Sequence, residues 1–194
     1  MNLKDEQHQA SHAAILESAR DLIRTRGIGG TRVADVMKGV GLTVGGFYAH
    51  FSSKQQLVDE ALRAAGADLV TRFFGRLEQA PEHERAREAI ERYLSTAHRD
   101  AAACPFPAVV GEIGTTAPEH TPVLAERVEA LAKRFEQVVP GERGTRRGRT
   151  LALVALLYGG LSMARALKGT ALSDEVLSAC RELATRAIEQ ESGT

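Results

Sequence analysis

Apolar residues along this chain recur at helical spacing, and this pattern constrains its fold more than any other feature. Two N-terminal stretches each keep their apolar residues on one helical face: Ile15, Ala19, Leu22 and Ile23, then Val33, Val36, Met37 and Val40. No run of β-branched residues alternates as a strand would, and no Asn-Gly or Asp-Gly hairpin turn occurs. The sequence therefore predicts an all-α protein, and its 194 residues suffice to bury a substantial core.

Glycines and threonines divide the N-terminal segment into short helices. Gly27 and Gly41 are expected to end the first two helices as left-handed caps. Thr31 and Thr43 are the expected N-caps of the second and third helices. Two short helices joined by a tight turn are typical of a helix-turn-helix.

The chain around the third helix indicates how it is held. Leu42 and Phe47 flank its N-cap as a hydrophobic staple, which sets the angle at which the helix leaves the turn. Ser53 followed by Gln56 is a capping box that opens a further helix. We therefore expect a three-helix head over residues 1–66 and a larger helical body over residues 67–194.

Two consecutive glycines lie inside the predicted third helix. Each glycine in a helix interior costs about 1 kcal/mol relative to alanine, so Gly45 and Gly46 weaken a short element considerably. Such a sequence is expected where a partner approaches the backbone closely. The major groove of DNA is such a partner, because the recognition helix of a helix-turn-helix meets base edges there.

The head resembles the TetR family of transcriptional regulators. The resemblance covers roughly residues 11–65 and rests on three segments: Thr31-Arg32-Val33-Ala34-Asp35-Val36, Gly41-Leu42-Thr43-Val44-Gly45-Gly46-Phe47-Tyr48-Ala49-His50-Phe51 and Ser53-Lys54-Gln55-Gln56-Leu57. It implies a DNA-binding head on a ligand-binding and dimerisation body, which varies freely within the family. It also implies a cytoplasmic homodimer that binds a palindromic operator, most often as a repressor, and is released by a small-molecule effector.

The residues expected to contact DNA lie in or beside the helix-turn-helix. They are Thr31, Arg32, Thr43, Val44, Gly45, Gly46, Tyr48, His50 and Lys54. Helix N-termini favour phosphate oxygens, and Tyr48 and His50 can each donate to a phosphate. Val44 departs from the polar or basic residue usual in the family, and we expect it to contact a thymine methyl. The aromatic residues of this segment could instead serve only the hydrophobic core. We expect that role for Phe47 and Phe51, but not for Tyr48.

Charge is distributed unevenly, although the chain as a whole has a formal net charge of zero. Residues 20–54 hold six basic and two acidic side chains, so the remainder of the chain is acidic in balance. A basic head on an acidic body would orient the protein on DNA without general stickiness.

The last two predicted helices, residues 149–168 and 173–191, offer more apolar surface than one subunit can hide. The family resemblance implies that they pair with their twins in a four-helix bundle; the alternative is a core within one chain. The expected interface residues are Leu153, Leu156, Leu157, Leu161, Val176, Leu177, Cys180, Leu183 and Ala184.

Residues between head and tail are candidates for an effector pocket, and the alternative is plain core. The candidate wall residues are Tyr93, Cys104, Phe106, Val109, Phe135, Tyr158 and Met163. Cys104 precedes Pro105 at an expected helix start, where a thiol can become reactive toward electrophiles; a buried structural cysteine is the other interpretation.

No pattern predicts catalysis, a cofactor, a metal site or a membrane span. The chain has no glycine-rich phosphate loop, His-Glu-x-x-His motif or Gly-x-Ser-x-Gly elbow, and its two cysteines lack metal-ligand spacing. The polar N-terminus without an apolar signal core predicts a cytoplasmic protein. The alternative function is a helical small-molecule or protein-binding module without DNA-binding activity.

Overall fold

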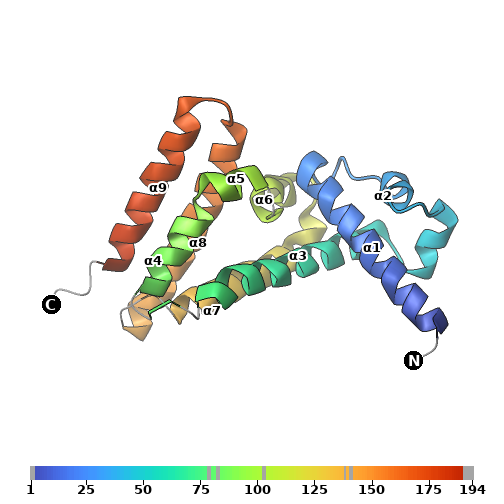
Figure 1. The fold of residues 1–194 in the computed structure, drawn as a ribbon, viewed down its shortest axis with the longest axis horizontal. Coiled ribbons are helices and arrows are strands. Elements are labelled where there is room, and N and C mark those ends of the chain that lie inside the picture. Colours follow the sequence, from blue (N-terminus) through green and yellow to red (C-terminus); the bar gives the residue numbers. More distant parts are fainter. Residues whose placement is uncertain are drawn as a thin grey trace. The chain divides into compact units, whose positions relative to one another are not determined.

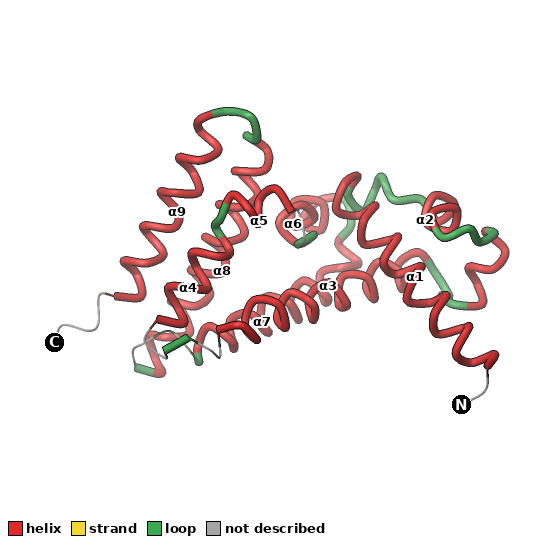
Figure 2. Tube along the Cα trace, in the orientation of Figure 1, coloured by secondary structure: helices red, strands yellow, loops and turns green. Residues whose placement is uncertain are grey.

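The computed structural model describes residues 3–77, 80–81, 84–101, 104–137, 139 and 142–189. Within these ranges the chain forms helices, turns and loops and no strand, which confirms the all-α prediction (Figure 2). No helix in these ranges is long and apolar enough to cross a membrane.

The helices follow one another in the order shown in Figure 1. They are α1 (Leu3–Arg26), α2 (Val33–Gly39), η1 (Val44–Ala49), α3 (Lys54–Leu77), α4 (Arg85–Tyr93), α5 (Thr96–Ala101), α6 (Phe106–Thr115), η3 (Pro118–His120), α7 (Thr121–Glu136), α8 (Arg143–Ala166) and α9 (Ala171–Glu189), where η marks a 3-10 helix.

The chain divides into two compact units. The first comprises Met1–Ala67 and Cys104–Leu124, and the second Asp68–Ala103 and Ala125–Thr194. The sequence had placed residues 104–124 in the body, yet they pack with the head. Side-chain bonds explain this difference: Glu112 accepts from the backbone of Ile28 and Gly29, and His120 Nδ1 lies 2.7 Å from Asp59 Oδ1.

The core of the first unit lies between α1, α2, η1 and α3. Its buried side chains include Ile15, Ala19, Ile23, Val36, Met37, Phe47, Phe51, Leu57 and Val58. The apolar faces predicted for the first two helices supply most of this core, and Phe47 and Phe51 are buried as expected. Gly27 and Gly41 follow α1 and α2 with φ of +72° and +71°, which confirms the two predicted left-handed ends.

The second unit is a helical bundle in which α8 packs along α9, and α4 packs against both. Two ion pairs fasten shorter helices to α9: Arg87 of α4 pairs with Glu189, and Arg99 Nη1 of α5 lies 2.5 Å from Asp174 Oδ1. The last helix begins at Ala171, two residues before the predicted start, so Ser173 is buried inside α9, where its hydroxyl donates to the carbonyl of Ala164 at 2.7 Å.

Candidate nucleic-acid interface

The expected recognition helix is a short 3-10 helix, η1, rather than an α-helix. Thr43 stands at its N-cap with extended backbone angles, and the N–H of Gly46 donates to the Thr43 carbonyl at 3.1 Å. Phe47 fixes the element to the core, while the chain on either side of it stays at the surface. A six-residue helix anchored by one buried aromatic therefore presents its other residues outward.

Packing within the chain does not require the glycine pair. A Cβ placed on Gly45 would approach only Thr43 Oγ1, at 3.9 Å, and one on Gly46 would approach Thr43 Oγ1 and the Met37 methyl at 3.8 and 3.9 Å. These are ordinary van der Waals distances, and neither glycine has a positive φ. An external partner that approaches the backbone accounts for both glycines better than the fold does.

Six of the predicted DNA-contacting residues lie on or next to this exposed surface. Val44 is 49% exposed and Tyr48 is 73% exposed, so both side chains are available to a partner. Arg32, Thr43 and Gly45 are also exposed, and Gly46 is half-buried. Leu42, the expected staple, is an exposed side chain as well.

Thr31 and Lys54 have different surroundings from those predicted. Thr31 is only 1% exposed, and its hydroxyl donates to the carbonyl of Gly27 at 2.7 Å, so it closes the turn after α1 and does not face a phosphate. Arg32, not Thr31, occupies the N-cap of α2. Lys54 Nζ donates to the carbonyl of Ile28 at 2.9 Å, which assigns it a structural bond within the head.

The capping box before α3 forms with a shift of one residue. The N–H of Gln56 donates to Ser53 Oγ at 3.1 Å, as predicted. The Gln56 side-chain oxygen, however, accepts from the backbone N–H and hydroxyl of Ser52, both at 2.7 Å, rather than from Ser53. The entry into α3 directly after η1 is therefore fixed by side chains.

His50 ends η1 in contact with the N-terminal turns of α1. Its ring stacks on His8 with centroids 4.2 Å apart and lies 5.9 Å from the ring of His12. Burial lowers the pKa of His50, and the neighbouring His8 and His12 lower it further. The sequence analysis did not include His8 and His12 in the site, although their i, i+4 spacing places both on one face of α1.

Glu112 of α6 is a second residue that the sequence analysis missed. Its carboxylate accepts the N–H of Ile28 at 3.2 Å and that of Gly29 at 2.9 Å, in the turn between α1 and α2. The Gly27-Ile28-Gly29-Gly30 run was a visible signal, because a glycine-rich turn exposes N–H groups that need an acceptor. Nothing in the sequence indicated which carboxylate would supply it.

The sequence of the head also matches a known family model. Residues 15–61 match the model described as bacterial regulatory proteins, tetR family. The chain belongs to the TetR family. The match includes the turn at Gly27, all of η1 and the start of α3, so it covers the elements that build the exposed surface.

Curated relatives match about a quarter to a third of this chain. The HTH-type transcriptional repressor KstR2 of Mycobacterium tuberculosis is 43% identical over 49 residues, which are 25% of this chain and 24% of that protein. KstR2 of Mycolicibacterium smegmatis is 37% identical over 65 residues, 34% of this chain and 30% of that protein. The matched part therefore spans less than a third of these relatives.

Solved TetR-family structures match the fold over nearly the whole chain. A TetR transcriptional regulator from Chloroflexus aurantiacus superposes with a TM-score of 0.79 at 21% identity and covers 95% of this chain and 97% of its own. A TetR-family regulator from Agrobacterium tumefaciens gives 0.75 at 22% identity, with 92% and 98% covered. The body of this chain thus has the fold of TetR-family regulators, at a low level of sequence identity.

The predicted effector residues are divided between the two units of this TetR-family chain. Cys104, Phe106 and Val109 are buried in the first unit, and Tyr93, Phe135 and Tyr158 in the second. Met163 is 56% exposed on the outer face of α8, so it does not line an enclosed pocket within this chain. A hollow of about 550 Å³ lies between α7 and α8, and its lining includes none of these seven residues. It is lined by Lys133, Glu136, Gln137, Arg146 and Arg147.

Five of the nine predicted interface residues are buried within one chain. These are Leu153, Leu157, Leu161, Leu177 and Ala184, which form the core between α8, α9 and their neighbours. A partner cannot reach them, so the structure assigns them to the subunit. Leu156, Val176 and Cys180 are half-buried and Leu183 is exposed, which leaves these four available to a partner.

Among the described residues, no group of three or more histidine, cysteine, aspartate or glutamate side chains is arranged to hold a metal ion.

Proposed function

We propose that this chain is a transcriptional repressor that binds a palindromic DNA operator as a homodimer and is released by a small-molecule effector. The observation that carries the proposal is the exposed surface of η1, where two glycines that the packing of the chain does not require lie between Val44 and Tyr48. At Gly45 and Gly46 no side chain stands between the backbone and a partner, which suits a helix pressed into the major groove. Repression is supported by the names of the curated relatives that match part of this chain.

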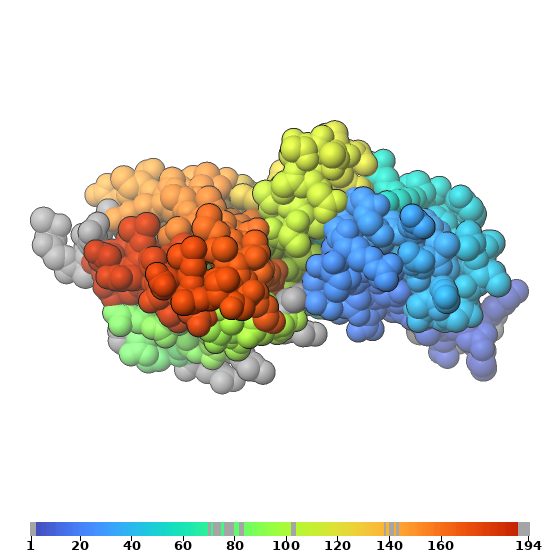
Figure 3. Space-filling model, turned by 90° about the horizontal axis from the view of Figure 1, so that it is seen from above, coloured from blue at the N-terminus to red at the C-terminus, as the bar shows by residue number. Residues whose placement is uncertain are grey.

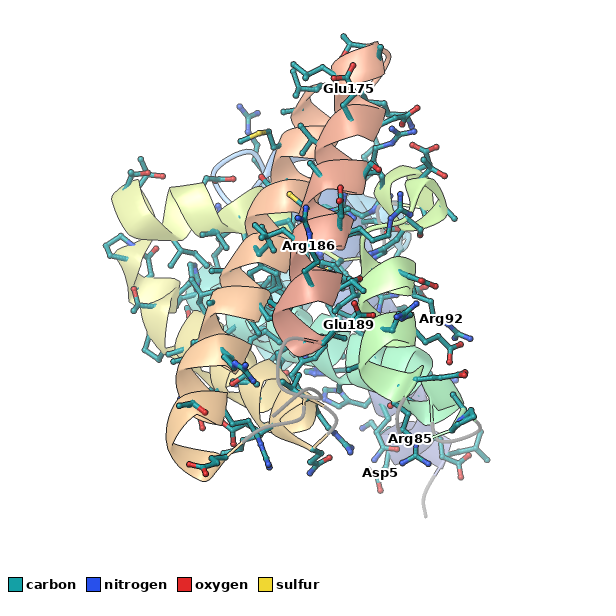
Figure 4. All side chains as sticks on the ribbon, turned by 90° about the vertical axis from the view of Figure 1, so that its left-hand side faces the viewer. Asp5, Arg85, Arg92, Glu175, Arg186 and Glu189 are labelled. Carbon is teal, nitrogen blue, oxygen red and sulfur yellow. The ribbon has the colours of Figure 1, made fainter. Side chains whose placement is uncertain are left out.

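An exposed apolar face on α8 and α9 supports the homodimer. On α8 the uncovered residues recur at helical spacing, as they do on α9: Ala152, Ala155, Leu156, Gly159 and Met163, then Leu172, Val176, Ala179, Cys180 and Leu183. Figure 3 shows α9, in orange to red, uncovered on its outer side, and Figure 4 shows α9 and α8 side by side at the same face.

The two apolar stripes converge where α8 and α9 touch. A Cβ on Gly160 would lie 2.8 Å from Cys180 Sγ, so these positions mark the line of contact. Leu156 and Met163 flank Gly160 along α8, and Leu183 lies one turn beyond Cys180 on α9. An exposed apolar area of this kind is typical of a protein–protein interface. In a two-fold dimer, each subunit would cover this area of its partner with its own copy of the same surface.

The dimer sets the geometry of the operator. Two η1 elements related by a two-fold axis read two half-sites about one DNA turn apart, roughly 34–36 Å. The operator is therefore expected to be a palindrome.

The effector is proposed to bind without forming a covalent bond. Cys104 is fully buried, and buried structural cysteines are inert, which argues against an electrophile-sensing role. In the second unit the rings of Tyr93 and Tyr158 stack with centroids 6.3 Å apart, and such an aromatic pair suits a small, partly apolar molecule.

Selection of duplexes from a random DNA pool tests the DNA-binding proposal. The wild type should enrich one palindrome, and Gly46→Glu should abolish binding to it. A Cβ on Gly46 meets only ordinary contacts, so the variant should fold, and loss of binding should report on the interface. Gly75→Glu is the matched control, because the same change enters open space on α3. Enrichment of no sequence by the wild type would favour the binding-module alternative.

The dimer is tested by Leu183→Glu, which places a charge on the apolar face of α9. Light scattering should show a monomer, and affinity for the selected palindrome should fall at least tenfold, because one half-site then binds alone. Val110→Glu is the control, since Val110 is an exposed apolar residue of α6, outside the apolar face of α8 and α9. A dimer that persists in Leu183→Glu would place the interface elsewhere.

A further inference from the structure

Three imidazole rings gather at the point where η1 ends and the first turns of α1 begin. The rings of His8 and His50 are stacked, with an interplanar angle of 16° and centroids 4.2 Å apart. His12 lies one turn further along α1, with its ring 5.9 Å from that of His50 and stacked on Phe51 at 4.5 Å. All three residues belong to the first unit, so one compact body fixes their arrangement.

Few compensating charges face this cluster. The carboxylate of Glu60, on α3, contacts His12, with Oε2 3.0 Å from His12 Nε2. The other oxygen of Glu60 accepts a 2.8 Å hydrogen bond from the side-chain amide of Gln56. On α1 itself, Lys4 and Asp5 precede His8 by one turn and have opposite charges. The Nδ1 atom of His50 is buried, and within the described part of the chain it has no hydrogen-bond partner.

This arrangement disfavours a proton on His50 in the free protein. Partial burial lowers the pKa of His50, and proximity to His8 and then to His12 lowers it further. If two of these neighbouring rings are protonated, two positive charges lie side by side. Only an added negative charge would offset their repulsion. Because Glu60 is already bonded to His12 and Gln56, that charge has to come from outside the chain.

We propose that His8, His12 and His50 form one proton-dependent phosphate-binding site at the edge of the DNA-reading surface, so that DNA binding is accompanied by proton uptake. The inference rests on the proposed DNA-binding function. DNA is the phosphate source because His50 directly follows η1, whose Val44 and Tyr48 are exposed, so a backbone phosphate beside η1 lies within reach of the cluster. A phosphate accepts hydrogen bonds from an imidazolium, and its negative charge offsets the repulsion between charged rings.

His8 is thereby a DNA-contacting residue that the helix-turn-helix alone does not include. His8 is exposed and stacks on His50, so these two rings are placed to meet the phosphate. His12 is half-buried and already contacts Glu60, so it acts on the other two rings through its charge. The long α1, which begins at Leu3, carries His8 to this position.

Imidazole NMR of the free, full-length protein tests the coupling between the rings. The His50 resonances should titrate below the ordinary histidine range in the wild type, and His8→Ala should move their midpoint upward because one repelling neighbour is lost. Gln9→Ala, an exposed change on the next residue of α1, should leave the midpoint in place. A His50 midpoint that does not move in His8→Ala would overturn the proposal.

Affinity for the palindrome selected with the wild type tests proton uptake. Uptake of one proton changes affinity by up to about tenfold per pH unit, and we expect at least about a threefold gain from pH 7.5 to 6.5 at fixed salt. His50→Gln should abolish this gain, and His8→Ala should reduce it, while Gln9→Ala keeps it. A wild-type affinity that is equal at both pH values overturns the inference and leaves the repressor proposal intact. Failure to select any duplex overturns both.

Discussion

The side chain of Glu112 accepts a 2.9 Å hydrogen bond from the backbone N–H of Gly29, a residue 83 positions earlier in the chain. Its second oxygen accepts the N–H of Ile28, so both oxygens of one carboxylate close the turn between α1 and α2. On the other side of that turn, Lys54 Nζ donates to the Ile28 carbonyl. The turn that positions α2, and through it η1, is therefore held by side chains from α6 and α3.

Removal of the Glu112 carboxylate should loosen this turn. Hydrogen bonds to a charged group contribute about 1.5–3 kcal/mol each, and the exposed N–H of Gly29 can recover part of this from water. We expect Glu112→Ala to lower the free energy of unfolding of the first unit by about 2 kcal/mol and to weaken binding to the selected palindrome. Urea denaturation followed by circular dichroism measures the first effect. Glu91→Gln, at an exposed position on α4, should change neither quantity.

A side chain at Gly27 should destabilise the protein more when Glu112 is present than when it is absent. Its φ of +72° costs an alanine about 1–2 kcal/mol, and a Cβ would lie only 1.9 Å from Glu112 Oε1, which forces the carboxylate out of its bonds. Gly27→Ala should therefore cost about 3 kcal/mol in the wild type and only the backbone share, about 1–2 kcal/mol, in Glu112→Ala. A double-mutant cycle in urea measures the difference. Additive effects would show that the two residues do not interact.

Much of the head could be predicted because its signals are local. The glycine ends of α1 and α2 follow from backbone conformations that few other residues adopt, and the apolar faces follow from helical periodicity. The 3-10 form of η1 was not predictable in the same way. Two glycines remove the propensity that would favour an α-helix, so the anchoring of Phe47 decides the geometry.

The misses share a different cause, since each depends on contacts between distant residues. Periodicity places Leu153 and Leu157 on a face of α8, but it does not state whether that face meets α9 or a second chain. In the same way, Thr31 has the residue type of a phosphate contact, and only the fold reveals the carbonyl of Gly27 within reach of its hydroxyl. Glu112 and His8 acquire their roles entirely from such long-range placement.

Val44 should read a thymine through its methyl group. The exposed part of η1 offers Val44 methyls and glycine backbone but no side chain able to form a bidentate bond to a purine. Burial of one methyl contributes about 0.8 kcal/mol, so replacing the contacted dT by dU in the selected palindrome should weaken binding about fourfold per half-site. A systematic dU scan by fluorescence anisotropy locates the position.

The same scan identifies the residue responsible. In Val44→Ala the sensitivity to dU at that position should largely disappear, because the methyl then has no apolar partner. Val110→Ala, an equal truncation at an exposed site of α6, should preserve the wild-type scan. A scan in which no thymine matters would show that shape and spacing alone select the operator.

His98 should make the second unit sensitive to acid. Its Nδ1 lies 2.8 Å from the carbonyl oxygen of Tyr93, which only accepts, so Nδ1 carries a proton. Burial, opposed by this bond and reinforced by nearby Arg165, lowers the pKa of His98 to about 4. The unfolded chain, with a histidine pKa of about 6.5, then binds more protons than the folded one below that pH. Stability should therefore be complete above pH 7 and fall as the pH drops from about 6.5 toward 4.

Tyrosine fluorescence can follow this loss in the second unit alone. The chain has three tyrosines and no tryptophan, and in a Tyr48→Phe background the remaining two, Tyr93 and Tyr158, both lie in the second unit. Lowering the pH from 7.5 to 4 should reduce its free energy of unfolding in urea by as much as about 3 kcal/mol. His98→Gln keeps a donor for the Tyr93 carbonyl but does not titrate, so its curve should be flatter, whereas His50→Gln should follow the parent. An equally steep loss in His98→Gln would assign the acid sensitivity to another group.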